Sequence, residues 1–157
     1  MKSVIASGLG LMLAIVVPPP KPVCELLSTG DVSKVVGVAV TVDPSQSGPA
    51  ENGWDFCAWK MPDGHFVIVG IGAKASLTAA RTDYAATLVS AFGGGPQSTA
   101  IAGLADEAQY RDYTGNLKGG VVVVRKGSAV MTIEAPTSRG DVLALARLVL
   151  ARVGAAR

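Results

Sequence analysis

Charged residues are scarce in this sequence, which limits the classes of protein it can belong to. Asp, Glu, Lys and Arg make up 17% of the 157 residues and hydrophobic residues 49%, whereas an average soluble domain is about 25% charged. The 14 basic and 12 acidic residues nearly balance, and the basic ones are scattered along the chain. This composition indicates a folded chain with a hydrophobic core, and it indicates neither a disordered protein nor a nucleic-acid partner.

Histidine is scarcer still, because His65 is the only one in the chain. A catalytic triad or a histidine metal site would depend on this residue, which follows a predicted turn where an exposed side chain is expected. Asp63 is the only carboxylate at ligand spacing from it, and the two groups are too few for a tetrahedral metal site. We therefore expect no metal and no other cofactor.

Motifs for phosphate binding and for nucleophilic catalysis are missing as well. The glycine-rich stretches 70–72 and 93–96 lack the Lys-Ser/Thr pair of a phosphate-binding loop, and no serine lies in a Gly-x-Ser-x-Gly elbow. Glycines inside an apolar strand, such as Gly70 and Gly72, more often mark a bulge or a close approach of the backbone. We interpret both stretches as structural.

Cysteine is limited to two residues, Cys24 and Cys57. An even number in an oxidising compartment most simply forms one disulfide. Two alternatives remain open. Cys24 could be a lipidated N-terminus, although Pro22 and Val23 before it are not the small residues that lipoprotein signal peptidases accept, or both cysteines could be free buried thiols.

The N-terminal segment has the layout of a signal peptide. Met1 and Lys2 precede an uncharged run over residues 3–17, and prolines at 18–20 end any helix. That run is shorter than the roughly 20 residues of a spanning helix. We divide the chain into a signal peptide or N-terminal anchor (1–17), a proline-rich linker (18–23) and a single domain (24–157). The expected location is secreted or in the cell envelope, with membrane contact only if the leader is retained.

Hydrophobic periodicity and turn residues predict three helices and six strands. The helices are expected over 28–37, 77–92 and 141–153, and the strands over 38–42, 54–60, 65–75, 107–113, 119–126 and 129–135. Asp141 is the predicted N-cap of the last helix, and residues 43–53 are a predicted polar loop. The order α-β-β-β-α-β-β-β-α predicts an α+β fold, with an antiparallel sheet and helices packed on one face.

Three of the eight aromatic residues fall in the predicted strand 54–60. Alternation along a strand places Trp54 and Phe56 on one face, and Cys57 and Trp59 on the other. Trp59 is expected in the core beside the disulfide. If the opposite face is uncovered, Trp54 and Phe56 form an exposed apolar patch that could receive a ligand or partner. The alternative is that a helix or loop covers them.

Three short motifs carry a family resemblance: Cys24-Glu-Leu-Leu-Ser-Thr-Gly-Asp-Val-Ser-Lys-Val-Val-Gly37, Cys57-Ala-Trp59 and Gly103-Leu-Ala-Asp-Glu-Ala108. The chain resembles small exported actinobacterial envelope proteins, many of them lipoproteins of unknown function, and the extracellular sensor domains of some mycobacterial serine/threonine kinases look similar. Ala105 replaces a glycine of the third motif, and the separate lipidated cysteine of those lipoproteins has no counterpart. The resemblance covers roughly residues 24 to 153. It implies a Cys24–Cys57 disulfide in an α+β domain with no established catalytic residues.

These observations favour a non-enzymatic exported binding module over a catalyst. Its partner would be a protein, a glycan or an apolar small molecule outside the cytoplasm, bound near Trp54 and Phe56. One alternative is a hydrolase or lyase that uses carboxylates together with His65, the candidates being Asp106, Glu107 and Asp112. Another is a structural accessory subunit of an envelope complex, with a flat apolar face.

Overall fold

A computed structural model describes residues 21–93 and 97–155 of the chain. The predicted signal peptide or anchor, 1–17, and positions 18–20 of the predicted linker lie outside the described residues. The helices are α1 (Val23–Leu26), α2 (Thr29–Val36), α3 (Leu77–Phe92) and α4 (Arg139–Ala155), with short 3-10 turns η1 (Pro44–Gln46) and η2 (Glu51–Gly53). The strands are β1 (Thr41–Val42), β2 (Gly48–Pro49), β3 (Trp54–Lys60), β4 (Phe66–Ala73), β5 (Thr99–Ala100), β6 (Glu107–Asp112), β7 (Gly120–Lys126) and β8 (Ala129–Ala135).

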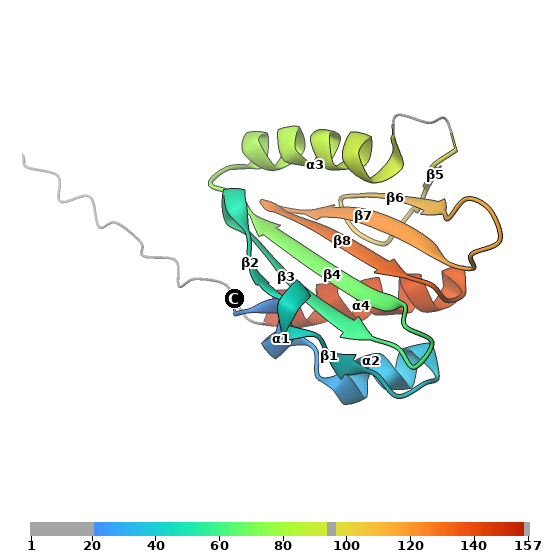
Figure 1. The fold of residues 1–157 in the computed structure, drawn as a ribbon. Coiled ribbons are helices and arrows are strands. Elements are labelled where there is room, and N and C mark those ends of the chain that lie inside the picture. The colour runs from blue at the N-terminus through green and yellow to red at the C-terminus, as the bar shows by residue number, and fades with distance from the viewer. Residues whose placement is uncertain (1–20, 94–96, 156–157) are drawn as a thin grey trace, which may run out of the picture.

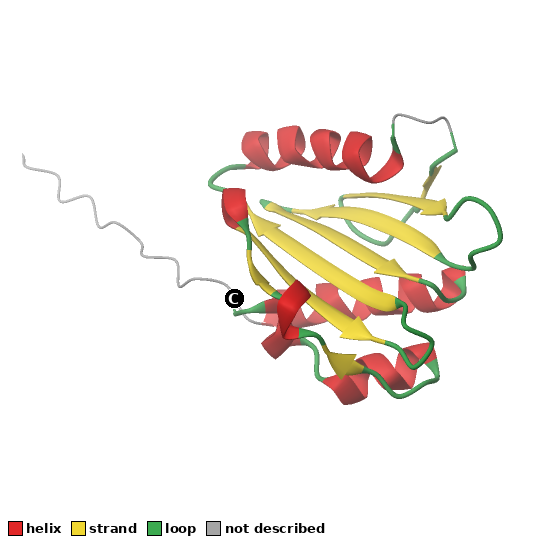
Figure 2. Cartoon of the chain, in the orientation of Figure 1, coloured by secondary structure: helices red, strands yellow, loops and turns green. Residues whose placement is uncertain are grey.

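The eight strands of the described residues form one antiparallel sheet (Figure 1, Figure 2). The order across the sheet is β1-β3-β4-β8-β7-β6-β5, and β2 also pairs with β3. In the centre, β4 pairs with β8, and Val69 is the direct partner of Ile133. This pairing joins the β3–β4 hairpin to the β6–β7–β8 meander. The predicted α+β class with an antiparallel sheet is confirmed.

Helices cover both faces of the sheet, so the expectation of helices on one face is wrong. The main core lies between one face and helices α1, α2 and α4, whereas α3 packs against β7 and β8 on the opposite face (Figure 1). The reason lies in the central strands. Residues 121–124 of β7 are four consecutive valines, so this strand is apolar on both faces and each face needs cover.

Capping residues define the helix ends, and one predicted cap is wrong. Helix α2 begins as expected after Ser28, whose hydroxyl accepts the Asp31 N–H at 3.1 Å while the Asp31 carboxylate accepts the Ser28 N–H at 3.0 Å. Helix α4 begins at Arg139 rather than at the predicted Asp141 cap. The hydroxyl of Ser138 accepts the Asp141 N–H at 3.2 Å, so a serine takes the capping role and the aspartate lies within the first turn.

Elements of two to four residues escaped the sequence prediction. Only β1 remains of the strand predicted over 38–42, and the predicted loop 43–53 contains η1, β2 and η2. Neither α1 nor β5 was expected. Such elements are too short to show a hydrophobic period, so the sequence carries no local signal for them. They form where neighbouring segments supply their contacts.

Candidate functional site

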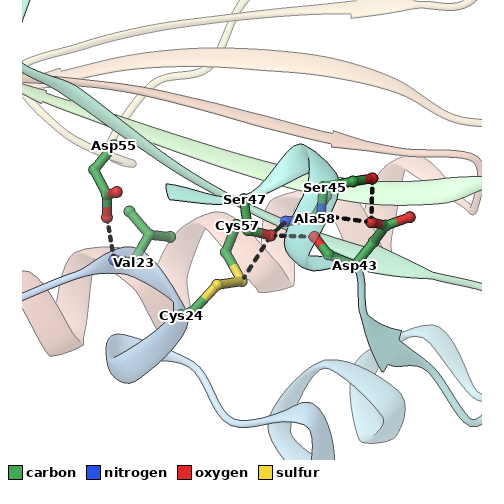
Figure 3. Close-up of a disulfide and its surroundings, with 8 residues drawn as sticks. All are labelled: Val23, Cys24, Asp43, Ser45, Ser47, Asp55, Cys57 and Ala58. Carbon is green, nitrogen blue, oxygen red and sulfur yellow. Dashed lines mark hydrogen bonds between the residues drawn. A yellow bond between two sulfur atoms is a disulfide. The ribbon is translucent and has the colours of Figure 1, made fainter. Parts of the chain in front are cut away.

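The predicted disulfide is present and fixes the start of the domain (Figure 3). Cys24 of α1 and Cys57 of β3 are bonded, with their Cα atoms 5.1 Å apart. Cys57 is fully buried in the main core, and Trp59 lies in the same core, as expected. In this structure both cysteines are therefore used for the bridge, which ties a short helix to the sheet.

Register shows which side chains share the α3 face of the sheet with Phe56. Phe56 pairs with Gly70, and Gly70 in turn pairs with Thr132. Direct partners on adjacent strands point to the same side of a sheet. Two further rows of direct cross-strand partners lie on this face, one on each side of the Phe56 row. The first contains Trp54, Gly72, Val130 and Arg125. The second contains Ala58, Ile68, Glu134, Val121 and Arg111.

The two aromatic rings lie against the glycines of β4. The Trp54 and Phe56 rings are stacked, with centroids 5.6 Å apart and planes inclined by 14°. A Cβ on Gly70 would lie 2.7 Å from Phe56 Cδ1, and one on Gly72 would lie 2.8 Å from Trp54 Cε2. No side chain could be added at either position without displacing a ring. The two glycines therefore give the close approach that the sequence suggested and let the rings lie close to the strand.

Helix α3 covers only part of this face and leaves an open groove over the aromatic pair. Trp54 and Phe56 are half-buried, which lies between the exposed patch and the covered side chains considered from the sequence. Two hollows of about 460 and 540 Å³ adjoin here and share four lining residues, Phe56, Ser90, Ala91 and Thr132. Cavities of this size suit small organic ligands.

Lys74 fixes Trp54 at one end of the groove. Its Nζ lies 5.4 Å from the centre of the Trp54 ring, 3.1 Å from Asp83 Oδ2 of α3, and 2.9 Å from the Asn52 carbonyl oxygen to which it donates. The ammonium therefore joins the aromatic strand to the helix above it through a cation–π contact and a partly buried ion pair.

The other end of the groove is polar. The Tyr113 hydroxyl donates to Glu134 Oε1 at 2.8 Å, and Arg111 Nη1 donates to the Phe92 carbonyl oxygen at the end of α3. Burial, reinforced by the bond to Glu134, raises the pKa of Tyr113, so this hydroxyl keeps its proton at physiological pH. The arrangement holds Glu134 on the floor of the groove, beside the apolar Ile68.

The residues of the hydrolase alternative do not gather in one place. Asp106 Oδ2 lies 3.4 Å from Arg125 Nη1 and accepts the Gly127 N–H at 2.7 Å, and Glu107 also pairs with Arg125. This ion-pair cluster joins the start of β6 to the turn after β7. Asp112 lies at the opposite end of β6, where it accepts from the Tyr110 hydroxyl.

The predicted position of His65 in the β3–β4 hairpin is confirmed. Its Nδ1 lies 3.2 Å from Asp63 Oδ2, and both side chains are about half exposed, 48% and 58%. No contact among residues 21–93 and 97–155 brings this histidine to any of the three carboxylates of the hydrolase alternative.

Asp106→Asn is expected to lower the free energy of unfolding by on the order of 1 kcal/mol at pH 7. The side chain is 36% exposed, so solvent screens part of the interaction. Its hydrogen bond from the Gly127 N–H, followed by that from Lys126, holds the pKa of Asp106 below its ordinary value. The contribution is therefore complete above about pH 4 and is lost as the pH falls through the lowered pKa.

Urea unfolding at pH 7 and at pH 3 measures this effect. The deficit of Asp106→Asn should be smaller at pH 3, while Glu25→Gln, an exposed carboxylate on α1, serves as the control at both pH values. An equal deficit at the two pH values would show that the carboxylate charge is not what stabilises the turn.

Two general features limit what the described residues can hold. Within 21–93 and 97–155, no three His, Cys, Asp or Glu side chains lie close enough together to bind a metal ion. Among the helices of the same ranges, none combines the length and the apolar character needed to cross a membrane.

Sequence reasoning found the aromatic pair but missed the rest of the groove. Thr132, Glu134 and Arg111 reach it from strands far along the chain. The only local signal was a pair of polar residues two positions apart in β8, Thr132 and Glu134, within an otherwise apolar strand. This pattern shows that one face of β8 is less apolar than the other, but it does not show that Phe56 lies on the same face of the sheet.

Comparison with known proteins adds no identification to these findings. No protein-family model matches the sequence, and the curated proteins include no match to it. The groove and the disulfide therefore carry the functional argument.

Proposed function

We propose that this chain is a non-enzymatic binding module that works outside the cytoplasm and binds its ligand in the groove between α3 and the sheet. The observation that carries the proposal is the stacked pair Trp54 and Phe56, which lies over two glycines and is only half-buried. Large aromatic side chains are costly to leave in water. An open surface that retains two of them is typical of a binding site.

The disulfide supports the extracytoplasmic part of this proposal. Structural disulfides form and persist in oxidising compartments and are rare in the cytosol, and the Cys24–Cys57 bridge ties the first helix to the sheet. The signal-like residues 1–17 and the resemblance to exported actinobacterial envelope proteins and kinase sensor domains point the same way. We place the protein in the secreted fraction or in the cell envelope.

The groove also favours a binding module over the two alternatives. The carboxylates proposed for hydrolysis are divided between an ion-pair cluster and the far end of β6. A structural subunit would be expected to present a flat apolar face, whereas this face is hollowed and has a polar end.

Phe56→Ala is expected to weaken the binding of a neutral apolar probe, 4-phenylbutan-1-ol, by about 10-fold, because it removes the aromatic floor that both hollows share. Titration followed by amide NMR should shift the resonances of Ser90, Ala91 and Thr132 in the unsubstituted protein. Val42→Ala is the matched control, because Val42 is 40% exposed and pairs with Trp59, on the opposite face of the sheet.

The unfolding midpoint of each variant is measured alongside, so that a loss of fold is not taken for a loss of binding. Trp54→Ala provides a second test of the same floor. The proposal is wrong if the shifts spread over both faces of the sheet, or if folded Phe56→Ala and Trp54→Ala bind the probe as well as the control does.

A further inference from the structure

We propose that the ligand of this groove is a small organic cation, with an ammonium or guanidinium group on an apolar body. This inference rests on the proposed function and specifies the chemistry of the ligand. It is drawn from the charges that line the groove, from the position of one carboxylate on its floor, and from the way the protein holds an ammonium of its own at the rim.

The lining of the groove is acidic. Two acidic residues, Glu51 and Glu134, line it against one basic residue, Arg111, whereas the Asp112 carboxylate accepts from Tyr110 of the main core. The chain as a whole has the opposite sign, with a formal net charge of +2. Such a surface attracts cations and repels anions, and the effect is strongest where the charge is partly removed from water.

Glu134 is the carboxylate best placed to bind a cation. It is half-buried on β8, and its cross-strand partners Ile68 and Val121 are apolar. One of its oxygens, Oε1, accepts the Tyr113 hydroxyl. An ionised carboxylate offers about four acceptor positions, so Glu134 keeps capacity for N–H donors of a ligand.

The distance between Glu134 and the aromatic floor fits a short amphipathic molecule. Phe56 on β3 and Glu134 on β8 are two strands apart across the sheet and are offset by two residues along the strand direction. These spacings place their Cα atoms about 12 Å apart. Their side chains point to the same face. A ligand with its ring over Phe56 and a chain of about four carbons can therefore reach the carboxylate.

The other charges near the groove are already engaged. Lys74 is held by the Trp54 ring, Asp83 and the Asn52 carbonyl, so its charge is balanced, and the rim itself shows an ammonium bound by an aromatic ring and a carboxylate. Arg111 donates to the carbonyl oxygen of Phe92 at the C-terminal end of α3, the negative end of the helix dipole. Glu134 therefore remains available to a ligand.

A matched series of three probes tests the charge preference directly. 4-Phenylbutylammonium, 4-phenylbutan-1-ol and 4-phenylbutanoate share one apolar body and differ at the end group. Titrated into the full domain at low ionic strength, the ammonium should bind about 10-fold more tightly than the carboxylate, with the alcohol between them. Addition of 0.5 M NaCl should reduce this difference. Glu134→Gln should lower the preference for the ammonium by about 3- to 10-fold, because it removes one carboxylate charge.

The variants separate this inference from the proposed function. Glu25→Gln on α1, an exposed carboxylate outside the groove, should leave all three affinities unchanged, whereas Glu134→Gln should weaken binding of the ammonium more than binding of the alcohol. Equal binding of the three probes would overturn the cation while keeping the groove as a binding site. Binding of a neutral oligosaccharide such as cellotetraose, with no response to the ammonium, would also overturn it. If none of the probes shifts a groove resonance, both proposals fail.

Discussion

Replacement of both cysteines by alanine is expected to lower the free energy of unfolding by about 3–4 kcal/mol, as estimated from the chain entropy of the loop that the bridge closes. Cys24 and Cys57 are 33 residues apart in sequence. The bridge holds α1, whose Val23 and Leu26 belong to the main core. A loss of this size is a large share of the stability of a small domain.

Urea unfolding of three samples measures this loss. The oxidised protein is compared with the double alanine variant and with the unsubstituted protein in the presence of a reductant. The last two should unfold at similar, lower urea concentrations. If the reduced protein unfolds at the same urea concentration as the oxidised one, the bridge contributes nothing, and its absence in a reducing compartment would not matter.

Gly70→Ala is expected to lower the free energy of unfolding by about 1–3 kcal/mol, the usual range when an added side-chain atom overlaps its neighbours. The added Cβ would lie 2.7 Å from Phe56 Cδ1 and 2.8 Å from Thr132 Oγ1, so the ring has to leave its position over the strand. The substitution should therefore also lower the affinity for 4-phenylbutan-1-ol, which binds over that ring in the proposed site.

A double-mutant cycle with Phe56→Ala isolates the cause. In the Phe56→Ala background the ring is gone, and Gly70→Ala should cost markedly less than in the unsubstituted protein. Gly154→Ala in α4 is the control, because a Cβ there meets no atom within 4 Å and alanine is favoured in a helix. Additive costs in the cycle would mean that the strand itself, and not contact with Phe56, requires glycine.

The fold class and the longer elements could be predicted because their signals are local. Alternating or continuous apolar runs, bounded by turns such as 61–64, locate β3, β4 and β8 to within one or two residues. The two cysteines suggested their own pairing, and period-two alternation placed Trp54 and Trp59 on opposite faces of one strand. Each of these signals lies within a few neighbouring residues, except the disulfide, which follows from the count of two cysteines.

The shape of the site could not be predicted because it depends on contacts between distant segments. Glu134 and Phe56 share a face only because β4 and β8 pair with Ile68 opposite Glu134, and no local pattern fixes that register. The position of α3 on the second face was missed for a similar reason. Its inward residues Ala80, Tyr84 and Phe92 show that it packs, but not on which side of the sheet.

The central pairing of β4 with β8 also determines when this domain can fold. A chain delivered from its N-terminus presents β3, β4 and α3 early, yet β4 has no inner neighbour until residues 129–135 arrive. Sheets closed by such long-range pairing fold slowly, and their exposed strand edges are prone to aggregate in the meantime. Both cysteines lie in the first segment to emerge, so an oxidised bridge can form before the sheet closes. In an oxidising compartment, the disulfide would then hold α1 against β3 while the sheet is still incomplete.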